Sequence, residues 1–137
     1  MNQDSRRKAR SLALVCQYQR QKLSESTVSE AQQLETFGLS KKNQEFTKLL
    51  LRTAHDQRPQ IDELIQKNLQ GWKQSRLLEP LNALLRISVA ELLMTPTTDS
   101  KVVFNEAIEL CRLYVSEGST KLLNGVLHAI TKEIRPD

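Results

Sequence analysis

Four positively charged side chains lie within five consecutive positions near the start of the chain. They are Arg6, Arg7, Lys8 and Arg10. The residues that follow have helical periodicity, so these cations fall in the first turns of an expected helix. Cations at a helix N-terminus oppose the helix macrodipole, at a cost of roughly 0.3–1 kcal/mol each. A placement that stability disfavours indicates a binding role, and nucleic-acid phosphate is the ligand that this cluster favours.

Tyr18 shares one sector of this helix with the three arginines. An aromatic ring beside guanidinium groups would offer single-stranded RNA a stacking surface as well as phosphate ligands. Three other interpretations of the pattern stay open: DNA binding, contact with a membrane surface, and a basic helix start that is merely solvated.

A further cation, Lys121, follows Ser119 and Thr120 at the start of the last expected helix. Unpaired backbone N–H groups at that end could bind a phosphate together with these side chains. The alternative is that Ser119 or Thr120 caps the helix and Lys121 points to water.

No set of residues in the sequence indicates catalytic chemistry. Glu106 and Glu109 could resemble catalytic acids, but no Gly-rich phosphate loop, poised histidine or metal-ligand set accompanies them. We expect Arg86 to pair with one of these two carboxylates or to stay exposed.

Cys16 and Cys111 lie on apolar helical stripes and are expected to be small buried hydrophobes without a disulfide. With two histidines and no Cys-x-x-Cys, neither a metal site nor a cofactor is predicted.

Length and composition indicate one compact domain. The 137 residues suffice for a real core, and the net charge of +4 is modest, so the basic character is concentrated locally. No apolar run approaches the roughly 20 residues that span a bilayer. No secretory signal is evident, and cytoplasm is the expected location, without a membrane partner.

Helical periodicity runs through nearly every segment, and strand-like alternation is absent. We expect an all-α, compact bundle of about seven helices in two small subdomains, about residues 1–75 and 76–137. The first helix is expected over residues 5–23, and the helix over residues 101–115 is expected to be the buried centre. Leu49 and Trp72 are placed on core stripes. Gly125, in the middle of the last helix, is expected where another helix crosses closely.

Several motifs of this chain resemble the NusB family of bacterial transcription antitermination factors over nearly the full length. The two blocks VFNEAIEL and NGVL, about twenty residues apart, are specific together. The matching segments are residues 6–10 with Tyr18, Trp72 with 76–77, 85–87 with 91–92, 103–110 and 124–127.

The resemblance implies an all-helical, non-catalytic RNA-binding domain. Members of the family bind the boxA element of ribosomal RNA leader transcripts together with NusE, a protein of the small ribosomal subunit. This heterodimer joins other Nus factors on RNA polymerase to suppress premature termination. By resemblance, the RNA-binding residues are Arg6, Arg7, Lys8, Arg10, Tyr18, Ser119 and Lys121.

The chain departs from the family pattern at positions that bear on the RNA-facing turn and on the NusE surface. These are Leu81, Gly118, Leu122 and His128. A homodimer that covers the basic helix is a further possibility in this family. Two alternative functions stay open: a detached RNA-targeting module of an rRNA-modifying enzyme, and a helical scaffold that binds only proteins.

Overall fold

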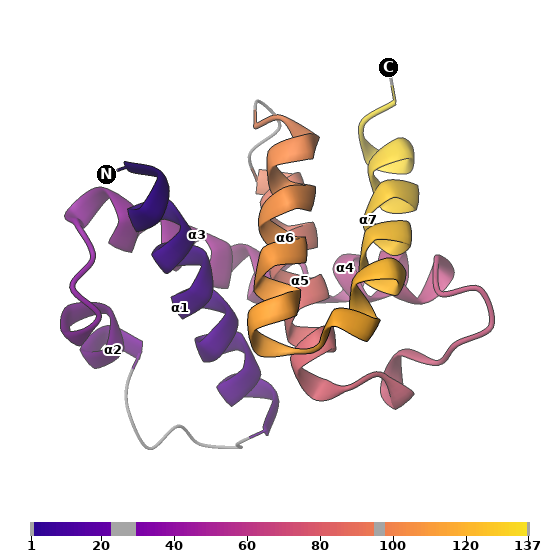
Figure 1. Ribbon diagram of the computed structural model, residues 1–137, viewed down its shortest axis with the longest axis horizontal. Helices are drawn as coiled ribbons and strands as arrows, with labels where there is room; N and C mark the ends of the chain where they lie inside the picture. Colours follow the sequence, from indigo (N-terminus) through magenta and orange to yellow (C-terminus); the bar gives the residue numbers. More distant parts are fainter. Residues whose placement is uncertain (1, 23–29, 95–97, 137) are drawn as a thin grey trace.

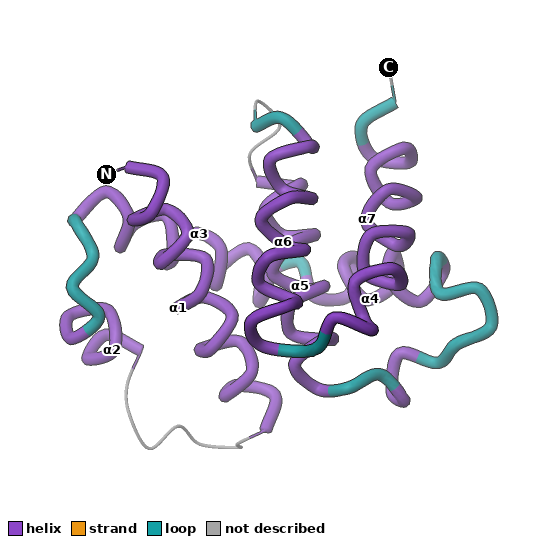
Figure 2. Tube along the Cα trace, in the orientation of Figure 1, coloured by secondary structure: helices purple, strands orange, loops and turns teal. Residues whose placement is uncertain are grey.

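Seven α-helices and two short 3₁₀ turns make up the part of the chain that the structure describes, residues 2–22, 30–94 and 98–136. This computed structural model has no strand within those ranges (Figure 2). The predicted all-α bundle of about seven helices is therefore confirmed. In chain order the elements are α1 (Asn2–Lys22), α2 (Glu30–Thr36), α3 (Lys41–Asp56), α4 (Arg58–Lys67), η1 (Gln74–Arg76), α5 (Glu79–Met94), α6 (Ser100–Tyr114), η2 (Glu117–Ser119) and α7 (Thr120–Ile134).

Local sequence signals set several helix boundaries. The Ser40 hydroxyl accepts a hydrogen bond from the backbone N–H of Asn43 and so caps α3. Asp99 caps α6 in the same way, by accepting from the N–H of Lys101 at 2.9 Å. Pro59 lies in the first turn of α4, where its missing N–H leaves no bond unmade.

The buried centre of the bundle is α5. Every residue from 81 to 92 is buried, and α5 packs against α1, α3, α4, α6 and α7. The expectation that residues 101–115 form the centre is wrong, because α6 leaves Leu113 69% exposed and Tyr114 45% exposed. Polar residues such as Ser88 and Glu91 interrupt the apolar pattern of α5, yet they too are buried. Their burial depends on partners from distant segments, which periodicity does not reveal.

Apart from α4, the other helices form two groups around α5. In Figure 1, α1, α2 and α3 lie together on one side, and α6 and α7 lie side by side on the other. Since α5 packs against members of both groups, it joins them. The boundary expected near residue 75 falls between α4 and α5, and the division into two subdomains stays a prediction.

Three residues differ from their expected positions. Leu49 is 43% exposed, because α3 turns Leu50 and Leu51 inward instead. Trp72 is 58% exposed, since α4 ends at Lys67 and its helical periodicity does not extend to residue 72. Gly125 is exposed, and a Cβ at this position would meet no atom within 4 Å. The predicted helix crossing at Gly125 is therefore wrong.

Candidate nucleic-acid interface

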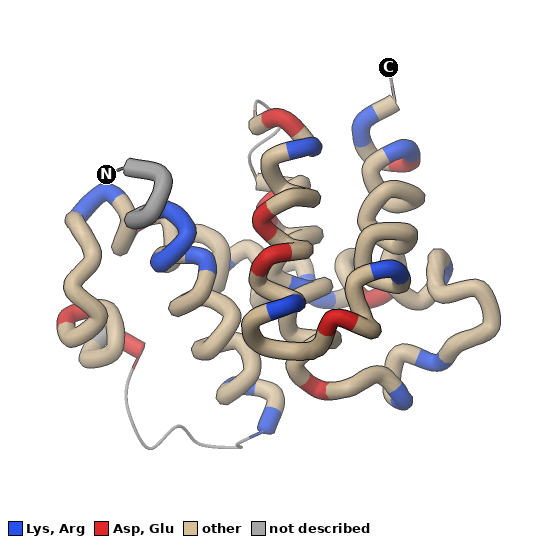
Figure 3. Tube along the Cα trace, viewed as in Figure 1, with Lys and Arg blue, Asp and Glu red and all other residues tan. Residues whose placement is uncertain are grey.

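The cations of α1 lie where this helix emerges from the core. Ala9, Leu12, Ala13 and Cys16 are fully or almost fully buried and fix the face that α1 turns toward α3 and α5. Basic residues gather around the first turns of α1, at the edge of its contact with α3 and α5 (Figure 3). The helix begins at Asn2, earlier than expected, and residue 23 lies outside the described residues.

Arg10 is an internal residue of this cluster. Its Nε and Nη2 donate to the two carboxylate oxygens of Glu91 at 2.8 and 2.6 Å, and its Nη1 lies 3.4 Å from Oε1 of Glu106. The side chains of Arg10 and Glu91 are only 8% and 3% exposed. A guanidinium held in this way fastens α1 to α5 and α6, and a phosphate outside the fold has little access to it.

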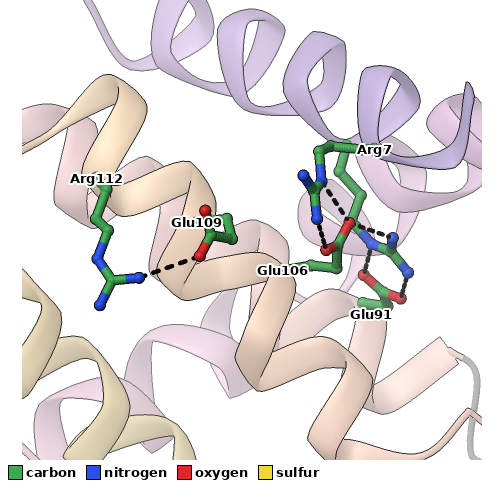
Figure 4. Close-up of polar contacts among 6 residues, drawn as sticks. Arg7, Glu91, Glu106, Glu109 and Arg112 are labelled. Carbon is green, nitrogen blue, oxygen red and sulfur yellow. Dashed lines mark hydrogen bonds and ion pairs between the residues drawn. The ribbon is translucent and has the colours of Figure 1, made fainter. Parts of the chain in front are cut away.

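Arg7 has an intermediate position. Its Nε and Nη2 donate to the carboxylate of Glu106 at 3.2 and 2.7 Å, and its side chain is 41% exposed (Figure 4). The two-pronged contact orients the planar guanidinium, while the exposed part of the group faces solvent. Arg7 is therefore a pre-oriented cation at the protein surface.

Arg6 stacks on an aromatic ring. Its Cζ lies 4.0 Å from the centroid of the Phe46 ring, and Cζ of Arg10 lies 5.3 Å from the same centroid. Burial and the nearby charge of Arg10 lower the pKa of the Arg6 guanidinium, which nevertheless keeps its charge at neutral pH. The ring beside these arginines is that of Phe46 in α3. Among the described residues, Tyr18 makes no such contact and packs instead against the core.

The charges of this region fall into two sets. The pair Arg7 and Arg10 is balanced by Glu91 and Glu106. Arg6 is half-buried and Lys8 is exposed, and neither forms an ion pair with any described residue. The excess positive charge of the α1 surface is thus concentrated at positions 6 and 8, with Arg7 beside them.

Ser119 belongs to η2 and Lys121 to α7, and α6 lies between α1 and α7 in Figure 1. The Ser119 hydroxyl is 2.9 Å from that of Ser116 and does not cap α7. The Thr120 hydroxyl donates to the carbonyl of Glu117 instead. Lys121 is exposed in the first turn of α7. A role for these residues in RNA binding stays a prediction.

Sequence reasoning missed the acidic partners of the cluster. Glu91 and Glu106 lie 81 and 96 positions from Arg10, too far for any local pattern to link them. The one signal in the sequence was Glu91, a charged residue inside the apolar stretch of α5, because such a residue needs a partner when it is buried. Arg86 gives the same signal, but its partner is Asp62 in α4, at 2.8 and 3.2 Å. The expected pairing of Arg86 with Glu106 or Glu109 is wrong.

Within the described ranges, no group of three His, Cys, Asp or Glu side chains is placed to hold a metal ion. In the same ranges, no helix is both long and apolar enough to cross a membrane. The fold and the surface thus define a class: an all-helical domain that presents clustered cations at the first turns of its first helix.

The sequence matches the model of the NusB family over residues 7–132. The chain belongs to the NusB family, which confirms the resemblance drawn from its motifs. A full-length relative is the transcription antitermination protein NusB of Clostridium perfringens (strain SM101 / Type A). It is 33% identical over an alignment of 140 positions, which covers 96% of this chain and 99% of the relative.

Solved structures of the family share the fold. NusB of T. maritima superposes with a TM-score of 0.83 at 30% identity, over 93% of this chain and 91% of that one. A structure of the antitermination factors NusB and NusE in complex with double-stranded RNA gives a TM-score of 0.83 at 29% identity. That match covers 95% of this chain and 98% of the other.

Proposed function

We propose that this chain is a non-catalytic antitermination factor that binds boxA-type RNA of ribosomal RNA leader transcripts together with NusE. The observation that carries the proposal is the positive charge of Arg6 and Lys8 at the start of α1, which forms no ion pair with a described residue, in a domain of the NusB fold. Two findings support it: full-length relatives are named transcription antitermination proteins, and a solved neighbour is a complex with NusE and RNA.

We infer different roles for the α1 cations from their surroundings. Lys8 and Arg6 supply charge that forms no ion pair with any described acid, and Arg7 presents an oriented guanidinium. These three side chains contact phosphates in the proposed complex. Arg10 acts as a positioning residue, because its contacts with Glu91 hold α1 on α5.

The small number of accessible cations explains the need for a partner. Three phosphate contacts to a single strand predict a slope of log K against log salt of about −2, at about −0.7 per contact. An interface of this size binds with modest affinity, so NusE must add RNA contacts for tight and selective binding. The pair would act in the cytoplasm within the RNA polymerase complex that contains the other Nus factors.

Fluorescence anisotropy of labelled RNA tests the proposal. A boxA-like and a scrambled single strand would be titrated with the chain, alone and with NusE. We expect a preference for the boxA-like strand that increases when NusE is present. Equal affinity for both strands, with NusE making no difference, would rule out the adaptor mechanism.

A further inference from the structure

A groove separates the segment that follows α4 from the outer face of α7. Its volume is about 370 Å³, within the range of small-ligand sites. Of the nine residues that line it, one is a cation and none is a carboxylate. They are Asn68, Leu69, Gln70, Trp72, Lys121, Leu122, Gly125, Val126 and Ala129.

The backbone around Trp72 is hydrogen-bonded at this groove, while more than half of the residue's surface is exposed. Gln66 donates from Nε2 to the carbonyl of Trp72 at 2.8 Å and accepts from the N–H of Gln74 at 2.9 Å. The N–H of Trp72 donates to the carbonyl of Leu69 at 3.2 Å. The backbone on either side is thus fixed, yet 58% of the tryptophan is exposed. A large aromatic surface that the fold positions but does not bury is suited to an external ligand.

Gly125 leaves open space at the same groove. A glycine in mid-helix lowers helix stability relative to alanine, and no neighbour requires it here, since a Cβ would meet nothing within 4 Å. The absence of a side chain lets a flat group approach the α7 backbone beside Leu122. Trp72 and Gly125 therefore contribute independently to this groove: one supplies an aromatic surface and the other leaves space beside it.

We propose that this groove holds one unpaired RNA base, stacked on Trp72, with its phosphate at Lys121. The inference rests on the proposed function: Lys121 is already among the residues that the resemblance implies for RNA binding, and the groove adds Trp72 and Gly125 as a site for a base. Stacking on an exposed aromatic ring next to a cation is how proteins bind single-stranded nucleic acid. The side-chain amides of Asn68 and Gln70, which also line the groove, can hydrogen-bond the edge of a base.

Charge and size favour a nucleotide over a protein segment. The lysine without any carboxylate among the lining residues complements a phosphate. Nine residues line the groove, whereas a specific protein interface usually takes about 20–30 residues from each partner.

The chain contains a single tryptophan, so its intrinsic fluorescence reports on this groove directly. The full chain would be titrated with an unlabelled boxA-like single strand, and binding would be followed in parallel by anisotropy of a labelled strand. We expect quenching of the tryptophan emission with the same midpoint as the anisotropy change.

Substitutions test the groove itself. Gly125→Leu fills it while favouring the helix, and should weaken RNA binding by about 5-fold to 150-fold, the range for loss of one stacked base. Lys121→Ala should reduce the salt slope by about 0.7. Lys132→Leu and Lys132→Ala are matched controls on the same helix outside the groove, and both should bind RNA as the unsubstituted chain does. Circular dichroism confirms that each variant is folded.

The outcomes separate this proposal from the proposed function. If the chain binds RNA by anisotropy while its tryptophan emission is unchanged, the groove proposal is overturned and the function stands. Emission that changes when NusE is added in the absence of RNA, and changes no further when RNA follows, would assign the groove to a protein and also overturn the proposal. If neither signal responds to boxA-like RNA, with or without NusE, the proposed function itself fails. The quenching measurement needs no substitution, so it decides even if a variant misfolds.

Discussion

Replacing Arg10 by alanine should destabilise the fold far more than replacing Arg6. Both residues belong to the basic segment of α1, but their surroundings differ. Arg10 is bound in two-pronged fashion by the almost fully buried Glu91 and also contacts Glu106. Arg6 is only half-buried and contacts the face of the Phe46 ring.

The expected magnitude follows from these contacts. Arg10→Ala leaves the Glu91 carboxylate in the interior without its main partner, and breaking a buried ion pair from one side costs about 3–5 kcal/mol. A single cation–π contact contributes only about 0.5–1 kcal/mol at an exposed site. The loss at Arg10 is a large fraction of the roughly 5–15 kcal/mol that stabilises a typical domain.

Urea unfolding followed by circular dichroism measures both effects. With a denaturant slope of about 2 kcal/mol per M, Arg10→Ala should lower the unfolding midpoint by about 2 M and Arg6→Ala by less than about 0.5 M. Arg10→Lys is an informative control, since it keeps the charge but loses the forked geometry, and should fall between them. A midpoint for Arg10→Ala within about 0.3 M of the unsubstituted chain would refute the assignment of Arg10 as an internal residue.

Three further predictions concern other parts of the fold. Desolvation acts to raise the pKa of Asp62, but hydrogen bonds from Arg86 and Gln74 outweigh it and leave that pKa below its ordinary value. Asp62→Asn should therefore lower the unfolding free energy by about 1–3 kcal/mol at pH 7. The difference in unfolding free energy between the variant and the unsubstituted chain should shrink as the pH falls below about 4, and a difference independent of pH would contradict this. Burial raises the pKa of the Cys16 thiol to about 11, so it should react with a disulfide reagent at pH 8 far more slowly in the folded chain than in urea, and equal rates would count against its burial. Gly125→Ala should raise the stability by about 1 kcal/mol in thermal unfolding, and a lower melting temperature would reveal a packing role that the structure does not show.

Much of the fold could be predicted because its signals are local. Helical periodicity, the caps at Ser40 and Asp99, and the proline in the first turn of α4 each act within a few residues. Trp72 was misplaced because it lies beyond the end of α4, where helical periodicity no longer applies.

The candidate site could be predicted only in part. The cations of α1 are evident from composition, but which of them face solvent depends on Glu91 and Glu106, which arrive from remote helices. In the same way, spacing on α1 pointed to Tyr18 as the ring beside the arginines. The ring that stacks there is that of Phe46, which α3 brings into place. Long-range pairing of this kind leaves no mark on helical periodicity.

The internal position of Arg10 determines which substitutions can test the function of α1. Removing all the arginines together would confound RNA contact with loss of stability, because Arg10 holds α1 to α5. The double variant Arg6→Ala/Lys8→Ala removes two accessible charges and spares the ion-pair cluster. Lys101→Ala/Lys132→Ala is its matched control, with the same loss of charge at exposed positions of α6 and α7.

The most direct measurement is the salt dependence of boxA-type RNA binding by these two variants in the presence of NusE. We expect Arg6→Ala/Lys8→Ala to stay folded, to bind more weakly, and to have a slope of log K against log salt that is smaller in magnitude by about 1.4. The control variant should keep the slope of the unsubstituted chain. If both variants retain the original slope and affinity, the start of α1 does not hold the transcript.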